Sequence, residues 1–218
     1  MRKTLFALAA LAALTAALVS AGTAAAGDYV CNNQTLGPMT VKGNLVVPSG
    51  AFCDLNGTHV TGNATAKAGP PEPSLPTGLL ADAAAIDGNV HVEKNAQFAA
   101  FDGSTIGGNV QCEKCEVADV QDSTVSGNLE DDGITEGAFL DNSTFGGNLQ
   151  IHNSSDGGFG FSIDGNSVGG NLQFMKNTGA SDISGNTIAG NLQCKDNAPP
   201  PAGADNTAKK KDGQCALL

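Results

Sequence analysis

The chain has 218 residues and a formal net charge of −11 at pH 7, because 22 acidic residues stand against 11 basic ones. This acidic balance argues against nucleic acid and against anionic membrane surfaces as partners. The chain has no tryptophan and one tyrosine, so the aromatic platforms on which bases and sugars stack are scarce.

Residues 1–26 have the layout of a secretory signal peptide. Arg2 and Lys3 precede a long apolar run, the small residues "TAAAG" follow it, and we expect cleavage near Ala26. Without Arg2 and Lys3, 9 basic residues remain against 22 acidic ones, a net charge of −13, and no arginine remains. No other stretch approaches the roughly 20 apolar residues that a membrane span needs. We therefore expect a secreted, extracellular monomer without a membrane span, with the cell wall as its candidate place of attachment.

A phrase centred on Gly-Asn recurs along the rest of the chain. It occurs eight times in one apolar frame, at intervals of 19, 26, 20, 19, 20, 23 and 20 along the sequence. A fixed period of about 20 residues is typical of a solenoid, in which each unit buries its apolar side by stacking on its neighbours. The asparagines of the eight units are Asn44, Asn63, Asn89, Asn109, Asn128, Asn148, Asn171 and Asn191.

The local pattern of each unit is that of short β-strands. In the fourth unit, alternate residues from Ile106 through Val110 to Cys112 lie on one side, which is the period of a strand and not of a helix. The segments "DGST", "QDST" and "DNST" between the strands have turn chemistry. We therefore predict an all-β, single-domain parallel β-helix (β-solenoid) of about eight coils with disulfide-capped ends.

The predicted organisation follows from these units. Residues 27–35 form an N-terminal cap, 36–194 the parallel β-helix repeats, and 195–218 a C-terminal cap and tail. The longest interval reflects an insertion at 65–84, which is rich in proline and is expected to leave the coil as a loop.

Six cysteines in an exported chain indicate three disulfides. In each of the pairs Cys31–Cys53 and Cys194–Cys215 the two members are separated by close to one coil, so each pair fits on adjacent rungs. We predict that these two disulfides close the two ends of the array. In the motif "CEKC" we predict a local disulfide, Cys112–Cys115, in place of the redox or metal chemistry that this motif suggests in a cytosolic protein.

The repeated asparagines allow two interpretations. In a flat strand they point outward beside Gln111, Gln150, Gln173 and Gln193, and the polar face suits a repetitive ligand such as a glycan or an ice plane. In a corner, the glycine tolerates a positive φ and the asparagine amide bonds along a ladder to its neighbours. We expect the structural ladder, and we keep the four glutamines as candidate ligand-binding residues.

Three consecutive acidic residues, Glu130, Asp131 and Asp132, depart from the repeat, since other units have glutamine and an apolar residue there. They are a candidate calcium site, and the alternative is a solvated charged face. The three histidines occupy different positions in their coils, so no shared metal or catalytic constellation is visible. We expect no cofactor, no bound metal and no catalytic residue.

Coils of the type "TIxGNLQC" and the tail "GNLQCKDNAPPPAGADNTAKKKDGQC" resemble secreted bacterial right-handed parallel β-helix repeat proteins, over about Leu36 to Cys215. Families of this shape are similar in outline to polysaccharide lyases and hydrolases, to surface adhesins and to bactofilins. The mature chain lacks arginine, whereas β-helical lyases rely on a basic residue near bound calcium. The resemblance therefore implies the fold and does not choose a function.

We expect an exported structural or surface-binding protein, not an enzyme, which recognises cell-wall or extracellular polysaccharide through a lateral face. Two alternatives stay open. A polysaccharide-degrading enzyme of the β-helix type needs an acid/base pair in a groove. A self-assembling surface filament needs open coil ends, whereas the C-terminal segment reads as a plug.

Overall fold

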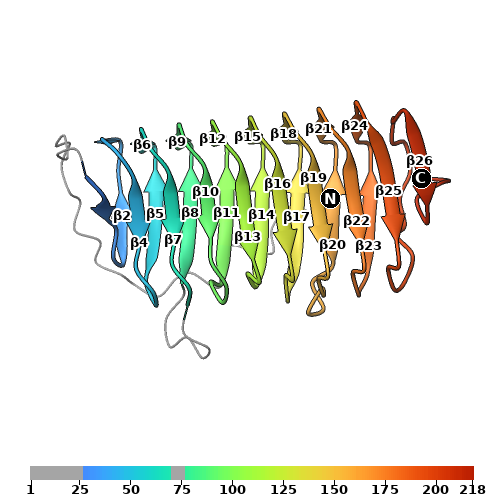
Figure 1. Cartoon of the computed structure of the whole chain (residues 1–218), viewed down its shortest axis with the longest axis horizontal. Helices are drawn as coiled ribbons and strands as arrows, with labels where there is room; N and C mark the ends of the chain where they lie inside the picture. Colours follow the sequence, from blue (N-terminus) through green and yellow to red (C-terminus); the bar gives the residue numbers. More distant parts are fainter. Residues whose placement is uncertain (1–26, 70–76) are drawn as a thin grey trace, which may run out of the picture.

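The structure is a computed structural model that describes residues 27–69 and 77–218, so the predicted signal peptide lies outside the described residues. The described chain consists of strands and turns without a helix, and it forms a parallel β-solenoid of about nine turns. Its coils stack along the long axis of the molecule (Figure 1). The predicted fold class is confirmed.

Three parallel sheets run along the solenoid, and we call them A, B and C. Sheet A contains β1 (Tyr29–Val30), β4 (Leu45–Val47), β7 (Ala64–Ala66), β10 (Val90–Val92), β13 (Val110–Glu113), β16 (Leu129–Asp132), β19 (Leu149–His152), β22 (Leu172–Met175), β25 (Asn191–Lys195) and β26 (Lys210–Gly213). Sheet B contains β2 (Gln34–Leu36), β5 (Phe52–Asn56), β8 (Gly78–Asp82), β11 (Phe98–Asp102), β14 (Val117–Gln121), β17 (Gly137–Asp141), β20 (Phe161–Asp164) and β23 (Ser181–Ser184). Sheet C contains β3 (Thr40–Val41), β6 (His59–Val60), β9 (Ala85–Ile86), β12 (Thr105–Ile106), β15 (Thr124–Val125), β18 (Thr144–Phe145), β21 (Ser167–Val168) and β24 (Thr187–Ile188).

The core lies between the three sheets and consists of columns of apolar side chains. In sheet A the register stacks Val90, Val110, Leu129, Leu149 and Leu172, all of them at most 2% exposed. Burial of such a side chain stabilises the fold by about 1.5–3 kcal/mol. One coil cannot bury its inward residues alone, so this stabilisation arises only when coils stack.

Two boundaries differ from the prediction. The C-terminal segment makes a further coil, because β26 pairs with β25, and Ala202 and Thr207 bridge to residues of β23 and β24. This coil lacks a Gly-Asn pair, so it was outside the predicted eight. The insertion at 65–84 is narrower than predicted, since β7 continues sheet A and β8 continues sheet B, which leaves 67–77 between them.

Each Gly-Asn pair lies at the corner between a sheet C strand and a sheet A strand. From the second pair onward, the backbone N–H of the asparagine donates to Oδ1 of the asparagine one coil earlier, at 2.7–3.0 Å. These bonds agree with the ladder interpretation. They satisfy corner N–H groups that have no strand partner, so they join each coil to the next.

The glycine of the pair is needed because a side chain at this position would clash with the previous coil, and not because the backbone needs a positive φ. A Cβ added at Gly147 would lie 2.3 Å from Oδ1 of Asn128, and one added at Gly127 would lie 2.4 Å from Oδ1 of Asn109. Among the eight pair glycines, all of them described, only Gly43 has a positive φ, of 101°. The predicted positive φ is therefore wrong for the other seven, whose shared feature is the close approach of the previous asparagine.

Two further ladders, which were not predicted, occupy the other corners. The ladder between sheets B and C consists of Ser104, Ser123, Ser143, Asn166, Asn186 and Asn206, all of them buried. Here the N–H of Ser123 donates to Oγ of Ser143 at 3.0 Å, and the N–H of Asn186 donates to Oδ1 of Asn206 at 3.1 Å. The ladder between sheets A and B consists of Ser154, Asn177, Asn197 and Gln214. In the sequence, the ladder between sheets B and C is signalled by the Ser or Asn within turn segments such as "DNST" and "SGNT".

The structure contains three disulfides, Cys31–Cys53, Cys112–Cys115 and Cys194–Cys215, with Cα–Cα distances of 5.7, 5.9 and 5.2 Å. The first and the last each join adjacent coils near the two ends of the array. The second closes the turn that follows β13, in the middle of the rod. All six sulfurs belong to residues that are buried in the core.

Candidate functional site

The predicted glutamines lie in one column on the outward face of sheet A. The register of the sheet aligns His91, Gln111, Glu130, Gln150, Gln173 and Gln193 on successive coils. Strand alternation produces this column, because the residues on either side of each member point into the core. Glu130 therefore interrupts the glutamines, and three of them remain in an unbroken row.

These three glutamines are hydrogen-bonded to one another. Nε2 of Gln150 donates to Oε1 of Gln173, and Nε2 of Gln173 donates to Oε1 of Gln193 at 2.8 Å. On the other side of Glu130, Nδ1 of His91 lies 3.2 Å from Oε1 of Gln111. The amide groups are thus held in a fixed orientation along the rod, while each side chain remains partly exposed.

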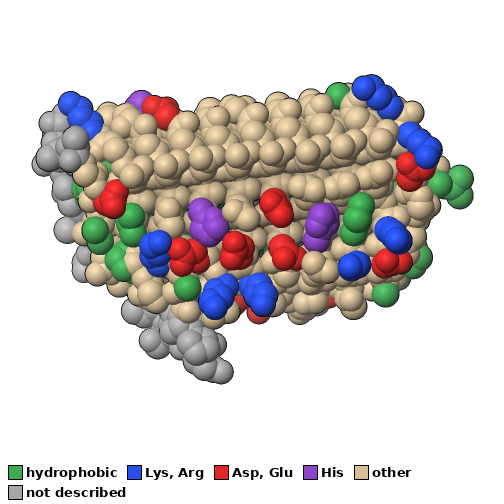
Figure 2. Space-filling model, in the orientation of Figure 1, with side chains coloured by type: hydrophobic (Ala, Val, Ile, Leu, Met, Phe, Trp, Pro, Cys, Tyr) green, Lys and Arg blue, Asp and Glu red, His purple; other side chains and the backbone are tan. Residues whose placement is uncertain are grey.

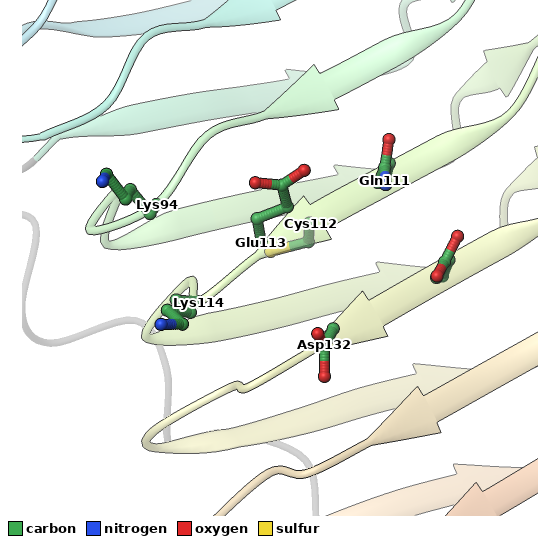
Figure 3. Close-up of a pocket in the computed structure, with 7 residues that line it drawn as sticks. Lys94, Gln111, Cys112, Glu113, Lys114 and Asp132 are labelled. Atoms are coloured by element: carbon green, nitrogen blue, oxygen red, sulfur yellow. The ribbon is translucent and has the colours of Figure 1, made fainter.

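A shallow hollow of about 210 Å³ opens next to this row (Figure 3). It is lined by Gln111, Glu113, Glu130, Asp132, Lys94 and Lys114, together with Cys112. Figure 3 shows Gln111 and Glu113 projecting from the same strand, and Lys94 and Lys114 at turns that follow two successive strands of sheet A. The sequence pointed to Gln111 and to the acidic residues separately, and the stacking of coils brings them together.

The hollow carries charges of both signs. Oε1 of Glu113 lies 3.9 Å from Nε2 of His91, and Oδ1 of Asp132 accepts a hydrogen bond of 2.7 Å from Nδ2 of Asn153. Within the described chain, Lys94 and Lys114 are in none of the ion pairs closer than 4.0 Å. Figure 2 shows acidic, basic and histidine side chains gathered on this part of the surface, below a broad band that lacks charged side chains.

The three consecutive acidic residues do not converge on one site. Glu130 and Asp132 point outward, whereas Asp131 is 1% exposed and stacks in the core column between Cys112 and Ile151. Burial, and to a smaller extent the charge of Glu130, raises the pKa of the Asp131 carboxyl to about 8. No group of three or more His, Cys, Asp and Glu residues in the described ranges is placed to hold a metal ion. The structure therefore does not assemble the predicted calcium site.

Both oxygens of Asp131 lack a hydrogen-bond partner in the structure. A carboxylate in such a place carries a large desolvation cost, and the group avoids it by remaining protonated. The neighbouring coils place a cysteine and an isoleucine at this position. Asp131 is therefore a polar defect in an apolar column, and nothing in the described chain compensates for it.

The fold and this face define a parallel β-solenoid with a polar, hydrogen-bonded lateral surface. Comparisons with protein-family models, with curated proteins and with solved structures found no match for the chain. Within the described residues there is no helix of the length and apolarity needed to cross a membrane.

Proposed function

We propose that the protein is a secreted, rod-shaped binding protein that holds a linear polysaccharide of the cell wall or the extracellular medium along the outward face of sheet A. From the repeated motif "TIxGNLQC" we also propose that it belongs with the secreted bacterial β-helix repeat proteins that it resembles. The observation that carries the proposal is the row of mutually hydrogen-bonded amides at Gln150, Gln173 and Gln193.

Amide groups suit the hydroxyl groups of a sugar, because they offer donors and acceptors together. An amide has two N–H donors and two acceptor lone pairs, so Gln173, which uses one of each along the row, keeps one of each for a ligand. The row is ordered before the ligand arrives, which reduces the entropy that binding costs.

The geometry of the coils favours a ligand that repeats. Neighbouring strands lie about 4.8 Å apart, so equivalent amides recur at this interval along the rod. A linear glycan presents equivalent hydroxyl groups at regular intervals, and several weak contacts then add along one chain. The hollow at Gln111 extends the same face and supplies carboxylate and ammonium groups for further contacts.

A glycan array and a cell-wall pull-down with the mature protein test the proposal. The variant Gln150→Ala/Gln173→Ala/Gln193→Ala is expected to weaken binding at least about tenfold, since each lost hydrogen bond contributes about 0.5–1.5 kcal/mol. The matched control, Thr124→Ala/Thr144→Ala/Thr187→Ala, removes three exposed side chains from sheet C and should bind as the wild type does. A chelator should have no effect, because Asp131 points away from this face.

Equal binding by the two triple variants would remove the glutamine row from recognition. An absence of binding by correctly folded, monomeric protein would contradict the proposed function itself. Circular dichroism of all three proteins establishes that the fold is intact before the affinities are compared.

A further inference from the structure

The outward face of sheet B differs in chemistry from the rest of the solenoid. Its eight strands contain seven aspartates and no lysine, arginine or histidine. One outward column of this sheet runs from Asp54 through Leu80 and Ala100 to Asp119 on four successive coils. Two aliphatic side chains thus lie in a row with a carboxyl group at each end.

A hollow of about 250 Å³ lies over this column, and every residue that lines it belongs to β5, β8, β11 or β14. Leu80 and Ala100 form its floor and are partly exposed. Asp82 and Asp102, on the adjacent outward column, stand along its side and are exposed. The short side chain of Ala100 leaves the space that a larger residue would fill. The hollow therefore combines an aliphatic floor with carboxyl groups at both ends and along one side.

The charge of this face is not compensated by the protein. None of the ion pairs in the described ranges involves an aspartate of sheet B. Burial, followed by the charge of Asp82, raises the pKa of Asp54, and Thr35 opposes this by a hydrogen bond. Burial, followed by the charges of Asp141 and Asp102, raises the pKa of Asp119 to about 6 against a hydrogen bond from Gln121. These carboxyl groups thus repel one another when they are charged, and a bound cation would relieve that repulsion.

We propose that this hollow on sheet B binds a linear aliphatic polyamine. The methylene chain of the ligand packs on Leu80 and Ala100, and its ammonium groups pair with the carboxylates at the ends and along the side. Asp54 and Asp119 are three coils apart, a distance of about 14 Å. A long polyamine spans this distance, whereas a short diamine reaches one end only.

The shape and the chemistry of the hollow distinguish this ligand from a bare metal ion. A hard cation needs several oxygens converging at about 2.0–2.6 Å, and no such group of acidic residues is formed in the described chain. A metal ion would also leave the aliphatic floor unused. An alkyl chain with ammonium groups uses both parts, as the stem and the head of a lysine side chain do at protein surfaces.

Isothermal titration with spermine, at an ionic strength of about 0.15 M where long-range attraction is screened, tests the proposal. We expect saturable binding that Asp54→Asn/Asp119→Asn weakens at least tenfold. Ala100→Leu, which fills the hollow without a change of charge, should weaken it to a similar extent. The control Asp196→Asn/Asp205→Asn removes the same charge from other exposed positions and should change the affinity less than twofold.

The proposal is overturned if the two Asp→Asn pairs weaken binding equally, since attraction would then be due to net charge. It is also overturned if butane-1,4-diamine binds as tightly as spermine, or if no saturation is reached. Tighter binding of a pentalysine peptide than of spermine would assign the face to a protein partner instead. Glycan binding by sheet A is measured on the same variants and is expected to stay unchanged, so the two proposals fail independently.

Discussion

Replacement of Asp131 by leucine is expected to stabilise the protein at neutral pH. Leucine carries two methyl groups where aspartate carries two oxygens, so it fits the same space between Cys112 and Ile151. The carboxyl has a pKa of 3.8 in the unfolded chain and of about 8 in the fold. Between these values the unfolded chain binds fewer protons than the fold, so stability falls as the pH rises.

The size of the effect follows from this difference in pKa. Each pH unit above 3.8 favours unfolding by about 1.4 kcal/mol until the folded group also ionises near pH 8, so at pH 7 the loss is about 4 kcal/mol. Asp131→Leu removes this loss, and its free energy of unfolding should exceed that of the wild type by about this amount at pH 7. Near pH 4 the ionisation term vanishes, and the two proteins should differ by much less.

Urea unfolding followed by circular dichroism at pH 4.5, 6.0 and 7.5 measures the effect. Other carboxyl groups with raised pKa, such as Asp119 and Asp141, remain in both proteins and cancel in the difference. The control Asp132→Asn removes an acidic residue from the outward side of the same strand and leaves the core column unchanged. The reasoning is refuted if the difference between Asp131→Leu and the wild type is the same at all three pH values, or if the variant is the less stable protein at pH 7.5.

Three further predictions concern the corners and the disulfides. Gly147→Ala places a Cβ 2.3 Å from Oδ1 of Asn128 and should lower the free energy of unfolding by about 1–3 kcal/mol. The control Gly37→Ala, whose Cβ has no atom within 4 Å, should leave the stability unchanged. Equal urea midpoints for the two variants would contradict the steric explanation. Asn186→Leu deletes a buried ladder member with several hydrogen bonds and should cost about 2–4 kcal/mol, and a loss below about 1 kcal/mol by the same measurement would show that the ladder contributes little. Replacement of both cysteines of Cys112–Cys115 by alanine should cost about 2 kcal/mol, because the closed loop is short; a loss as large as the roughly 3–4 kcal/mol expected for Cys194–Cys215 would contradict this.

The fold could be predicted from the sequence because its information is local and repeated. Each coil repeats the same alternation of inward and outward residues. A wrong interpretation of one coil therefore does not change the predicted fold class. The further coil at the C-terminus was not predicted, because it contains no Gly-Asn pair. Its inward positions are instead occupied by residues such as Pro201, Asn206 and Cys215, which are buried. The structure identifies this coil by the parallel pairing of β26 with β25, because the sequence there has no Gly-Asn pair.

The candidate site could be predicted only in part. The glutamine column follows from the regular period of the coils, and so does the inward direction of Asp131, which comes two positions after the buried Leu129. The hollows depend on which residues stack on one another in neighbouring coils. Because the insertions change the number of residues per coil, these stacked partners cannot be found by counting a fixed period along the sequence. Asp54 pairs with Leu80, farther along the chain than one ordinary coil, because additional residues separate β7 from β8 in the sequence.

The corner ladders cross each boundary between coils in opposite senses. Beside sheet A, Asn128 accepts at its side chain from the later coil, whereas between sheets B and C, Ser143 accepts at its side chain from the earlier one. The boundaries between the coils that contain both Ser104 to Asn186 and Asn109 to Asn191 therefore present the same pair of joints, and one of these coils fits at the place of another. Duplication of the gene segment that encodes one such coil would lengthen the rod, and the new boundary would contain only contacts of the kinds already present. Recombination alone can therefore change the length of the rod.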